Sequence, residues 1–166
     1  SQIDLKINYV NQQLIFLDND APSSITRLQN MGTPDYLISA AVTLILAQRL
    51  ARKTCPNCRV PDEDITPKAL TDFGFTVEEA SRAKAQKGEG CSQCKDSGYK
   101  GRMGIYEILS VSKPIKEAIL AKATTPELKA IAMKEGFRTM QDMGRELILT
   151  GDLNFREYDR VLSTEG

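Results

Sequence analysis

The sequence predicts a mainly α-helical fold with a small β component, and three observations support this. After Pro114, apolar residues recur at helical spacing almost to the end of the chain. An apolar run of the same period covers residues 34–53 and is long enough for one buried helix. All four cysteines fall within residues 54–104, a stretch rich in Gly and Pro that favours a small stapled subdomain. A chain of 166 residues can form one domain or two small ones.

The N-terminal third predicts strands and then helices. Residues 1–18 hold two apolar runs separated by Asn and Gln, which favours two short strands that could form a hairpin. A helix is expected over Ser24–Met31, ending at Gly32, since glycine is common just past a helix end. The next helix is expected from Pro34 to Lys53. It is apolar nearly all round, so we expect a long buried helix.

The cysteine-bearing segment also contains helical patterns. Two short helices are expected between the cysteine pairs, over Pro67–Phe73 and Val77–Lys87. The second carries many charges and is expected to be a solvated helix that bridges the two pairs. A strand is expected over Met103–Val111.

The C-terminal part predicts a helical bundle. Thr124 or Thr125, and Asp152 or Asn154, are of the residue types that begin helices. The expected helices are Pro114–Lys122, Pro126–Glu135, Met140–Leu149 and Asn154–Leu162.

The composition excludes several classes of function. Lys and Arg total 22, and Asp and Glu also total 22, so the formal net charge is zero. This argues against a nucleic-acid or anionic-membrane partner, which favours a basic excess. The absence of His removes His-based catalytic triads and His-bearing zinc sites. Residues 1–10 lack the pattern of a secretory signal, and the longest apolar-leaning run, residues 37–47, is too short to span a bilayer.

The four cysteines form two C-x2-C pairs, Cys55 with Cys58 and Cys91 with Cys94, separated by 32 residues. Two residues between ligands allow a tight turn that aims both sulfurs at one ion about 2.3 Å away. Two such turns complete a tetrahedral shell of four thiolates. The spacing therefore predicts a structural Zn²⁺ site on these four residues, with no position left for a substrate.

Neighbouring residues suit this interpretation. Lys53, Arg59 and Lys95 would offset the net charge of about −2 on a zinc tetrathiolate. Gly90, Gly98 and Gly101 permit the turns that bring backbone N–H groups to the sulfurs. Three alternatives stay open: a thiol redox pair, disulfides of a secreted domain, and buried free thiols.

Motifs for catalysis are missing from the sequence. It contains no G-x-x-x-x-G-K-[ST] loop to hold nucleotide phosphates and no G-x-G-x-x-G. Because no Ser or Cys has a His partner, triad hydrolysis is excluded as well. From its residues alone, the chain is expected to be a zinc-stapled module that does not catalyse.

Several longer motifs are more specific. They are T-R-L at residues 26–28, M-G at 31–32, A-Q-R-L-A-R-K-T-C-P-N-C at 47–58, C-S-Q-C at 91–94 and G-Y-K-G-R-M-G-I-Y-E at 98–107. Together and in this order, they resemble the C-terminal part of the ATPases that drive type IV pilus assembly and type II secretion. The resemblance covers roughly residues 19–163.

The resemblance implies a piece of a motor. In that family, a RecA-like core carrying the Walker motifs precedes a tetracysteine zinc subdomain and a helical C-terminal region. The parent protein is implied to be a hexameric, ATP-binding and Mg²⁺-dependent ATPase involved in protein transport. It would be cytoplasmic and peripheral to the bacterial inner membrane. Implied partners are the upstream core, neighbouring subunits and inner-membrane platform and assembly proteins, with no nucleic acid. This chain lacks Walker A and Walker B and is expected to be inactive alone.

The resemblance also implies a division of the chain and two further site residues. Residues 1–18 match the family least, 19–53 would end the ATPase core, 54–104 would form the zinc subdomain and 105–166 the helical subdomain. Arg27 and Arg102 match positions that face the nucleotide in the complete enzyme. The alternatives are a surface ion pair for Arg27, and for Arg102 a contact with Glu107 or with carbonyls of the cysteine turns. Arg49 and Arg52 are expected to anchor the zinc subdomain or a helix C-terminus.

Two other functions compete with the motor interpretation. An independent zinc-ribbon adaptor would bind nucleic acid or protein, and for nucleic acid it should show a basic face with interleaved aromatics. Tyr99, Lys100 and Arg102 are the one such cluster in the sequence. A thiol redox protein is the third hypothesis.

Overall fold

The computed structural model describes residues 8–10, 13–18 and 20–162 of the chain. The chain folds as two compact units. The first unit runs up to Gln48 and resumes over Tyr106–Thr139; the second comprises Arg49–Ile105 and the chain from Met140 onward. Within the described residues, no helix combines the length and the apolar character needed to cross a membrane.

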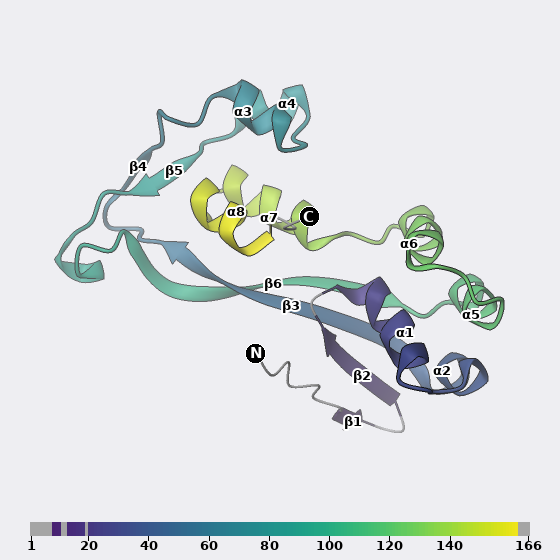
Figure 1. The fold of residues 1–166 in the computed structure, drawn as a ribbon. Helices are drawn as coiled ribbons and strands as arrows, with labels where there is room; N and C mark the ends of the chain where they lie inside the picture. The colour runs from purple at the N-terminus through teal and green to yellow at the C-terminus, as the bar shows by residue number, and fades with distance from the viewer. Residues whose placement is uncertain (1–7, 11–12, 19, 163–166) are drawn as a thin grey trace. The chain divides into compact units, whose positions relative to one another are not determined.

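A sheet with the strand order β1-β2-β3-β6 belongs to the first unit, and its last two strands continue into the second (Figure 1). Strands β1 and β2 are antiparallel, whereas β2 and β3 are parallel, with Ile15 opposite Leu44. Parallel neighbours need a crossover connection, and α1 and α2 supply it. The strands are β1 (Asn8–Val10), β2 (Gln13–Asp18), β3 (Val42–Thr54) and β6 (Tyr99–Ser110).

The prediction of one long buried helix over Pro34–Lys53 is wrong. Helix α2 (Asp35–Ala41) ends after seven residues, and β3 begins at Val42. Residues Val42, Thr43 and Ile45 are β-branched and favour a strand. An apolar run without a polar face fits a buried strand as well as a buried helix, and the parallel partner β2 decides between them.

The other expected strands of the first unit are confirmed where they are described. Strands β1 and β2 form the antiparallel pair expected within residues 1–18; the remainder of that prediction, at residues 1–7 and 11–12, lies outside the described residues. The strand expected over Met103–Val111 is found and begins earlier, at Tyr99. Helix α1 also begins earlier than expected, at Ala21, because Pro22 fits its first turn.

Four helices supply most of the first unit's core. The amide of Ala21, at the start of α1, donates to the buried carboxylate of Glu107 on β6 at 2.5 Å. The hydroxyls of Thr26 and Thr125 lie 2.7 Å apart and join α1 to α6. A capping box at Thr124 begins α6, as its sequence predicts. The helices are α1 (Ala21–Asn30), α2, α5 (Lys113–Leu120) and α6 (Thr125–Lys134). Their buried residues include Ile25, Leu28, Ile38, Ile115, Ile119 and Leu128.

The second unit combines a short two-stranded ribbon with four helices (Figure 1). The helix expected over Val77–Lys87 ends at Arg82, because residues Gln86–Gly88 instead pair with Arg59–Pro61 as antiparallel strands. The helices expected at 67–73, 140–149 and 154–162 are found within one residue of their expected ends. The elements are β4 (Arg59–Pro61), α3 (Pro67–Asp72), α4 (Val77–Arg82), β5 (Gln86–Gly88), α7 (Met140–Leu149) and α8 (Phe155–Leu162).

Aromatic side chains attach the α3–α4 segment to α8. The ring of Phe73 meets that of Phe155 edge-on, with centroids 4.4 Å apart, and buried Phe75 lies beside Tyr158 at 6.5 Å. Edge-to-face aromatic pairs stabilise by about 1 kcal/mol beyond the area they bury. Helix α4 is largely exposed, as expected, but the segment that carries it is anchored rather than only solvated.

The second unit also buries a charged residue, Glu157 on α8. Its side chain is fully buried, and its carboxylate accepts five hydrogen bonds, three from Arg52 on β3 and two from Arg160. Burial by itself raises the pKa of Glu157, but the hydrogen bonds from the two arginines outweigh it and lower the pKa to about 2. The ionised carboxylate is therefore part of the folded structure.

This pKa shift predicts a pH-dependent stability. Because the folded pKa is lowered from 4.5 to about 2, the contribution is complete above pH 4.5 and is lost as the pH falls toward 2. Removing one partner of a buried ion pair costs about 3–5 kcal/mol. We expect Glu157→Gln to lose free energy of unfolding of this order at pH 7 and progressively less below pH 4.5, measured by urea denaturation. Glu78→Gln, which breaks a surface pair with Arg82, should cost about 0.5 kcal/mol. A deficit of Glu157→Gln that is independent of pH would contradict the assignment.

Candidate metal centre

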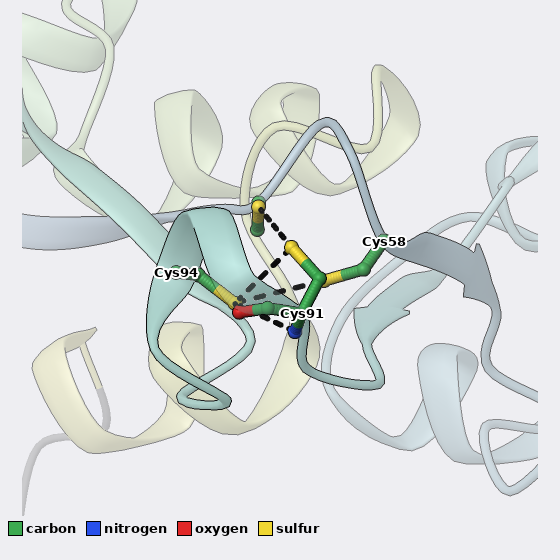
Figure 2. A group of neighbouring side chains, drawn as sticks. Cys58, Cys91 and Cys94 are labelled. Atoms are coloured by element: carbon green, nitrogen blue, oxygen red, sulfur yellow. Dashed lines mark hydrogen bonds between the residues drawn. The ribbon is translucent and has the colours of Figure 1, made fainter.

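Two segments of the second unit bring the four cysteines together. Cys55 follows β3 and Cys58 precedes β4. Cys91 and Cys94 begin and end a single 3-10 turn (Ser92–Cys94) that lies before β6. Figure 2 shows the side chains of Cys58, Cys91 and Cys94 pointing toward one another, and the sulfur of Cys55 belongs to the same group. The two pairs that the sequence singles out thus form one cluster, which we call the cysteine cluster.

The spacing of the sulfur atoms fits a metal ion. The Sγ atoms of Cys55 and Cys91 are 3.9 Å apart, those of Cys58 and Cys94 3.8 Å, and those of Cys91 and Cys94 3.7 Å. Four sulfurs in a tetrahedron, each about 2.3 Å from a central ion, lie about 3.8 Å from one another. A disulfide would need about 2.05 Å. All four sulfurs lie within 4.8 Å of one another, and within the described residues no other group of His, Cys, Asp or Glu gathers in this way.

Backbone hydrogen bonds hold the cysteine cluster in place. The N–H of Cys55 donates to the carbonyl of Gly98 at 2.9 Å, which joins the end of β3 to the start of β6. The N–H of Glu89 donates to the carbonyl of Cys58 at 3.1 Å. Within the second pair, the N–H of Cys91 donates to the sulfur of Cys94 at 3.2 Å. Backbone hydrogen bonds thereby tie the segment of each pair to the segment of the other.

The surroundings of Cys58 and Cys94 shift the pKa values of these two thiols in opposite directions. Burial by itself raises the pKa of Cys94, but N–H groups of Gly98 and Cys91 and the neighbouring thiols lower it to about 6. Burial raises the pKa of Cys58 to about 12, and the other thiols reinforce this against a hydrogen bond from Gly90. A central cation would favour the thiolate form at all four.

Two glycines make the close approach behind the cysteine cluster possible. A β-carbon on Gly88 would lie 2.1 Å from the carbonyl oxygen of Gly98, and one on Gly98 would lie 2.5 Å from the carbonyl oxygen of Gly88. Backbone atoms cannot move aside as a flexible side chain can. Since the carbonyl of Gly98 also accepts from Cys55, a displacement there reaches the first pair.

The two arginines expected near a nucleotide belong to different units. Arg27 lies in the last turn of α1 in the first unit and is half-buried. Arg102 is exposed on β6 in the second unit. Glu107, considered above as a partner for Arg102, is a first-unit residue that accepts from Ala21. The role of both arginines in a nucleotide site stays a prediction.

Sequence reasoning missed the buried ion cluster of Glu157 with Arg52 and Arg160. Glu157 was visible only as a helix-start signal, although its spacing of three from Arg160 on one helix face indicates an ion pair. Arg52 does anchor this region, as expected, and its guanidinium also lies 4.0 Å from the centre of the Tyr99 ring. Arg49 donates to the carbonyl of Val161 near the end of α8 at 2.5 Å.

The glycine contact predicts that Gly88→Ala disturbs the cysteine cluster. Overpacking against backbone costs about 1–3 kcal/mol, so we expect a loss of that order in urea denaturation and faster reaction of the cysteines with a thiol reagent. Gly101→Ala is the matched control: its β-carbon would meet nothing within 4 Å, and it strains only its own backbone, at φ +80°. Its cysteines should react at the wild-type rate. Equal reaction rates in both variants would show that the Gly88 contact is not needed.

Comparison with known proteins places the chain in a family. Residues 17–160 match the family model described as type II/IV secretion system protein. The chain is 37% identical over 139 residues to the type IV pilus assembly ATPase PilB of Myxococcus xanthus, covering 84% of this chain and 25% of that protein. It is 39% identical over 142 residues to PilB of Thermus thermophilus, covering 84% of this chain and 16% of that protein.

A type II secretion protein is also similar. Type II secretion system protein E of Aeromonas hydrophila is 32% identical over 143 residues, covering 86% of this chain and 28% of that protein. The chain thus spans about a quarter or less of the length of its first relatives. The matched region begins at residue 17, and the division of the chain at residues 18, 53 and 104 stays a prediction. With the family model covering most of its length, the chain belongs to the type II/IV secretion system protein family.

Proposed function

We propose that this chain is the C-terminal, zinc-binding part of a motor ATPase that couples ATP-driven motion to pilus assembly or type II secretion. The observation that carries the proposal is the cysteine cluster, found in a chain that matches about a quarter of a pilus assembly ATPase. The cysteine cluster supports a metal-binding role for this chain. The motor function of the full-length protein is proposed from the relatives, which are named as a pilus assembly ATPase and a type II secretion system protein.

Zinc is the metal that this donor set fits best. Four thiolates in a tetrahedron select Zn²⁺ over hard cations such as Mg²⁺ and Ca²⁺, which prefer oxygen. Because four cysteines fill the tetrahedron, the ion would be structural, holding the end of β3, the base of the β4–β5 ribbon and the start of β6. No substrate position remains at the ion.

The catalytic part of the proposed motor lies outside this sequence. The relatives are named as ATPases, whereas this chain carries no phosphate-binding loop. ATP and Mg²⁺ would bind to a RecA-like core upstream, with Arg27 and Arg102 near the nucleotide. A guanidinium suits that place because it makes bidentate contacts with phosphate. The parent would act as a hexamer at the cytoplasmic face of the inner membrane, with platform and assembly proteins as its partners.

The nucleic-acid adaptor is less well supported. An adaptor of this kind would stack bases on exposed aromatic rings. Tyr99, the aromatic of the one basic–aromatic cluster, already has Arg52 on its ring and Asn154 on its hydroxyl. The neutral net charge points the same way.

The zinc proposal predicts about one zinc per chain. Elemental analysis of protein purified without added metal should give about one zinc atom per chain. Replacing Cys91 with Ser removes one of four ligands and should lower the zinc content severalfold, whereas Ser81→Ala, on the exposed helix α4, should retain it. A metal-free, disulfide-bonded protein would overturn the proposal and favour the redox hypothesis.

The motor proposal predicts that the isolated chain does not hydrolyse ATP. Phosphoryl transfer needs a phosphate loop, a bound Mg²⁺ and a positioned water. In the full-length parent, Arg27→Ala or Arg102→Ala should lower turnover without changing the zinc content. The loss would be about a hundredfold or more if the arginine stabilises transition-state charge. Turnover and zinc are measured on the same samples, and Lys100→Ala, an exposed neighbour on β6, is the control. Hydrolysis by the chain alone, or full turnover in both arginine variants, would contradict these assignments.

A further inference from the structure

The turn between α7 and α8, residues 150–154, lies against the segments that carry the cysteines. The N–H of Thr54, the residue before Cys55, donates to the carbonyl of Asp152 at 3.0 Å. This is a backbone bond from the immediate neighbour of a metal-ligand candidate. It ties the position of Cys55 to the turn independently of side chains.

The second cysteine pair is tied to the same turn from its other side. Tyr99 lies five residues after Cys94, and its hydroxyl accepts from the Nδ2 of Asn154 at 2.9 Å. The Oδ1 of Asn154 in turn accepts a hydrogen bond from the N–H of Glu157 at 2.8 Å. Asn154 thus caps the N-terminus of α8. One buried amide thus joins the segment after Cys94 to the first turn of the last helix.

A third contact comes from β5, which leads into Cys91. The Oε1 of Gln86 lies so close to Gly151 that a β-carbon there would be 2.5 Å away, and Gly151 has φ +78°. The backbone conformation favours glycine at residue 151, and a larger residue would displace the end of the Gln86 side chain. The residue before Cys55, Tyr99 after Cys94 and Gln86 on β5 thus all contact the turn at residues 150–154.

Arg52 and Glu157 close this arrangement. The guanidinium of Arg52 lies on the ring of Tyr99 and donates two hydrogen bonds to Glu157, at 2.7 and 3.0 Å, and its N–H donates a third at 2.8 Å. Glu157 therefore contacts β3, the strand before Cys55. Through Arg52 it is also linked to Tyr99, at the start of β6. If α8 undocked, Arg52 would lose its hydrogen bonds to Glu157, and Tyr99 would lose its hydrogen bond from Asn154.

We propose that metal binding at the cysteine cluster and docking of the α7–α8 helices are one coupled equilibrium, with Glu157 and Asn154 as positioning residues for the metal site. The inference rests on the proposed function, since it needs the cluster to bind a metal. The bound ion fixes the segments that the turn contacts, and the docked turn fixes the segments that the ion needs. Coupling is reciprocal, so the factor by which docking raises metal affinity is the factor by which metal stabilises docking. Chelation of the metal would then release α8.

The experiment measures both sides of the coupling. Zinc affinity is determined with a competing chelator for the wild-type chain, Glu157→Gln, Asn154→Ala and the control Glu78→Gln, whose exposed carboxylate pairs with Arg82 in the same unit. Because groups behind a metal's ligands support its affinity by about 10–100-fold, we expect losses in that range for the first two variants. The zinc affinity of the control Glu78→Gln should stay within about twofold of the wild-type affinity.

Hydrogen exchange of the wild-type chain tests the reverse direction without a mutation. On removal of zinc, amides of α8 should lose protection, whereas those of α5 and α6 in the first unit should keep theirs. This measurement holds even if Glu157→Gln fails to fold, because it needs no variant. Unchanged protection of α8, or equal loss across α5, α6 and α8, would overturn the inference.

The outcomes separate the inference from the proposed function. Zinc bound with wild-type affinity by both Glu157→Gln and Asn154→Ala would overturn the coupling and leave the zinc site intact. A wild-type chain that binds no zinc would overturn the proposed site itself, and the coupling with it.

Discussion

The second unit depends on the convergence of four sulfur atoms supplied by two chain segments 32 residues apart. To bring them within 4.8 Å, the end of β3 and the start of β6 must meet, and they do so through Cys55 and Gly98. The approach is so close that Gly88 and Gly98 touch through their backbones. The ribbon of β4 and β5 and the turn at Cys91 follow from the same requirement.

Features carried by local sequence could be predicted, and features that depend on distant partners could not. The two cysteine pairs and the helix starts at Thr124 and Asn154 depend on neighbours within a few residues, and the structure has the cysteine cluster and both starts. The helix expected over Pro34–Lys53 failed because the partner of β3 is β2, about thirty residues earlier, and the apolar run alone does not distinguish strand from helix. The helix beginning at Val77 was predicted too long for the same kind of reason. The last residues of the expected helix, from Gln86 on, form β5 and pair with the distant strand β4.

The ionised carboxylate of Glu157 illustrates a further limit of sequence reasoning. Its partner Arg52 lies 105 residues away, and nothing local shows that a charged residue in an amphipathic helix faces inward. Burying a charge is costly unless it is paired and hydrogen-bonded, and here five donors satisfy it. An apolar residue could fill the same space but could not select one position of α8 against β3, since apolar contacts are non-directional. The arrangement therefore favours one docked geometry over many similar ones.

The β4–β5 ribbon closes the base of the segment that connects the two cysteine pairs. Arg59 pairs with Gly88 and Pro61 with Gln86, and one residue further in the N–H of Asp62 donates to the carbonyl of Ala85. The chain between Asp62 and Ala85 thus leaves and returns through a closed base. Lengthening a loop beyond such a base adds only about 0.6 kcal/mol of closure entropy for each doubling. A long connection on the far side of this base therefore costs little at the sulfur atoms, which fits a gap between cysteine pairs longer than the roughly 15–20 residues of an ordinary zinc ribbon. Phe73 and Phe75, which attach this segment to α8, restrict changes of its length to the chain outside those two contacts.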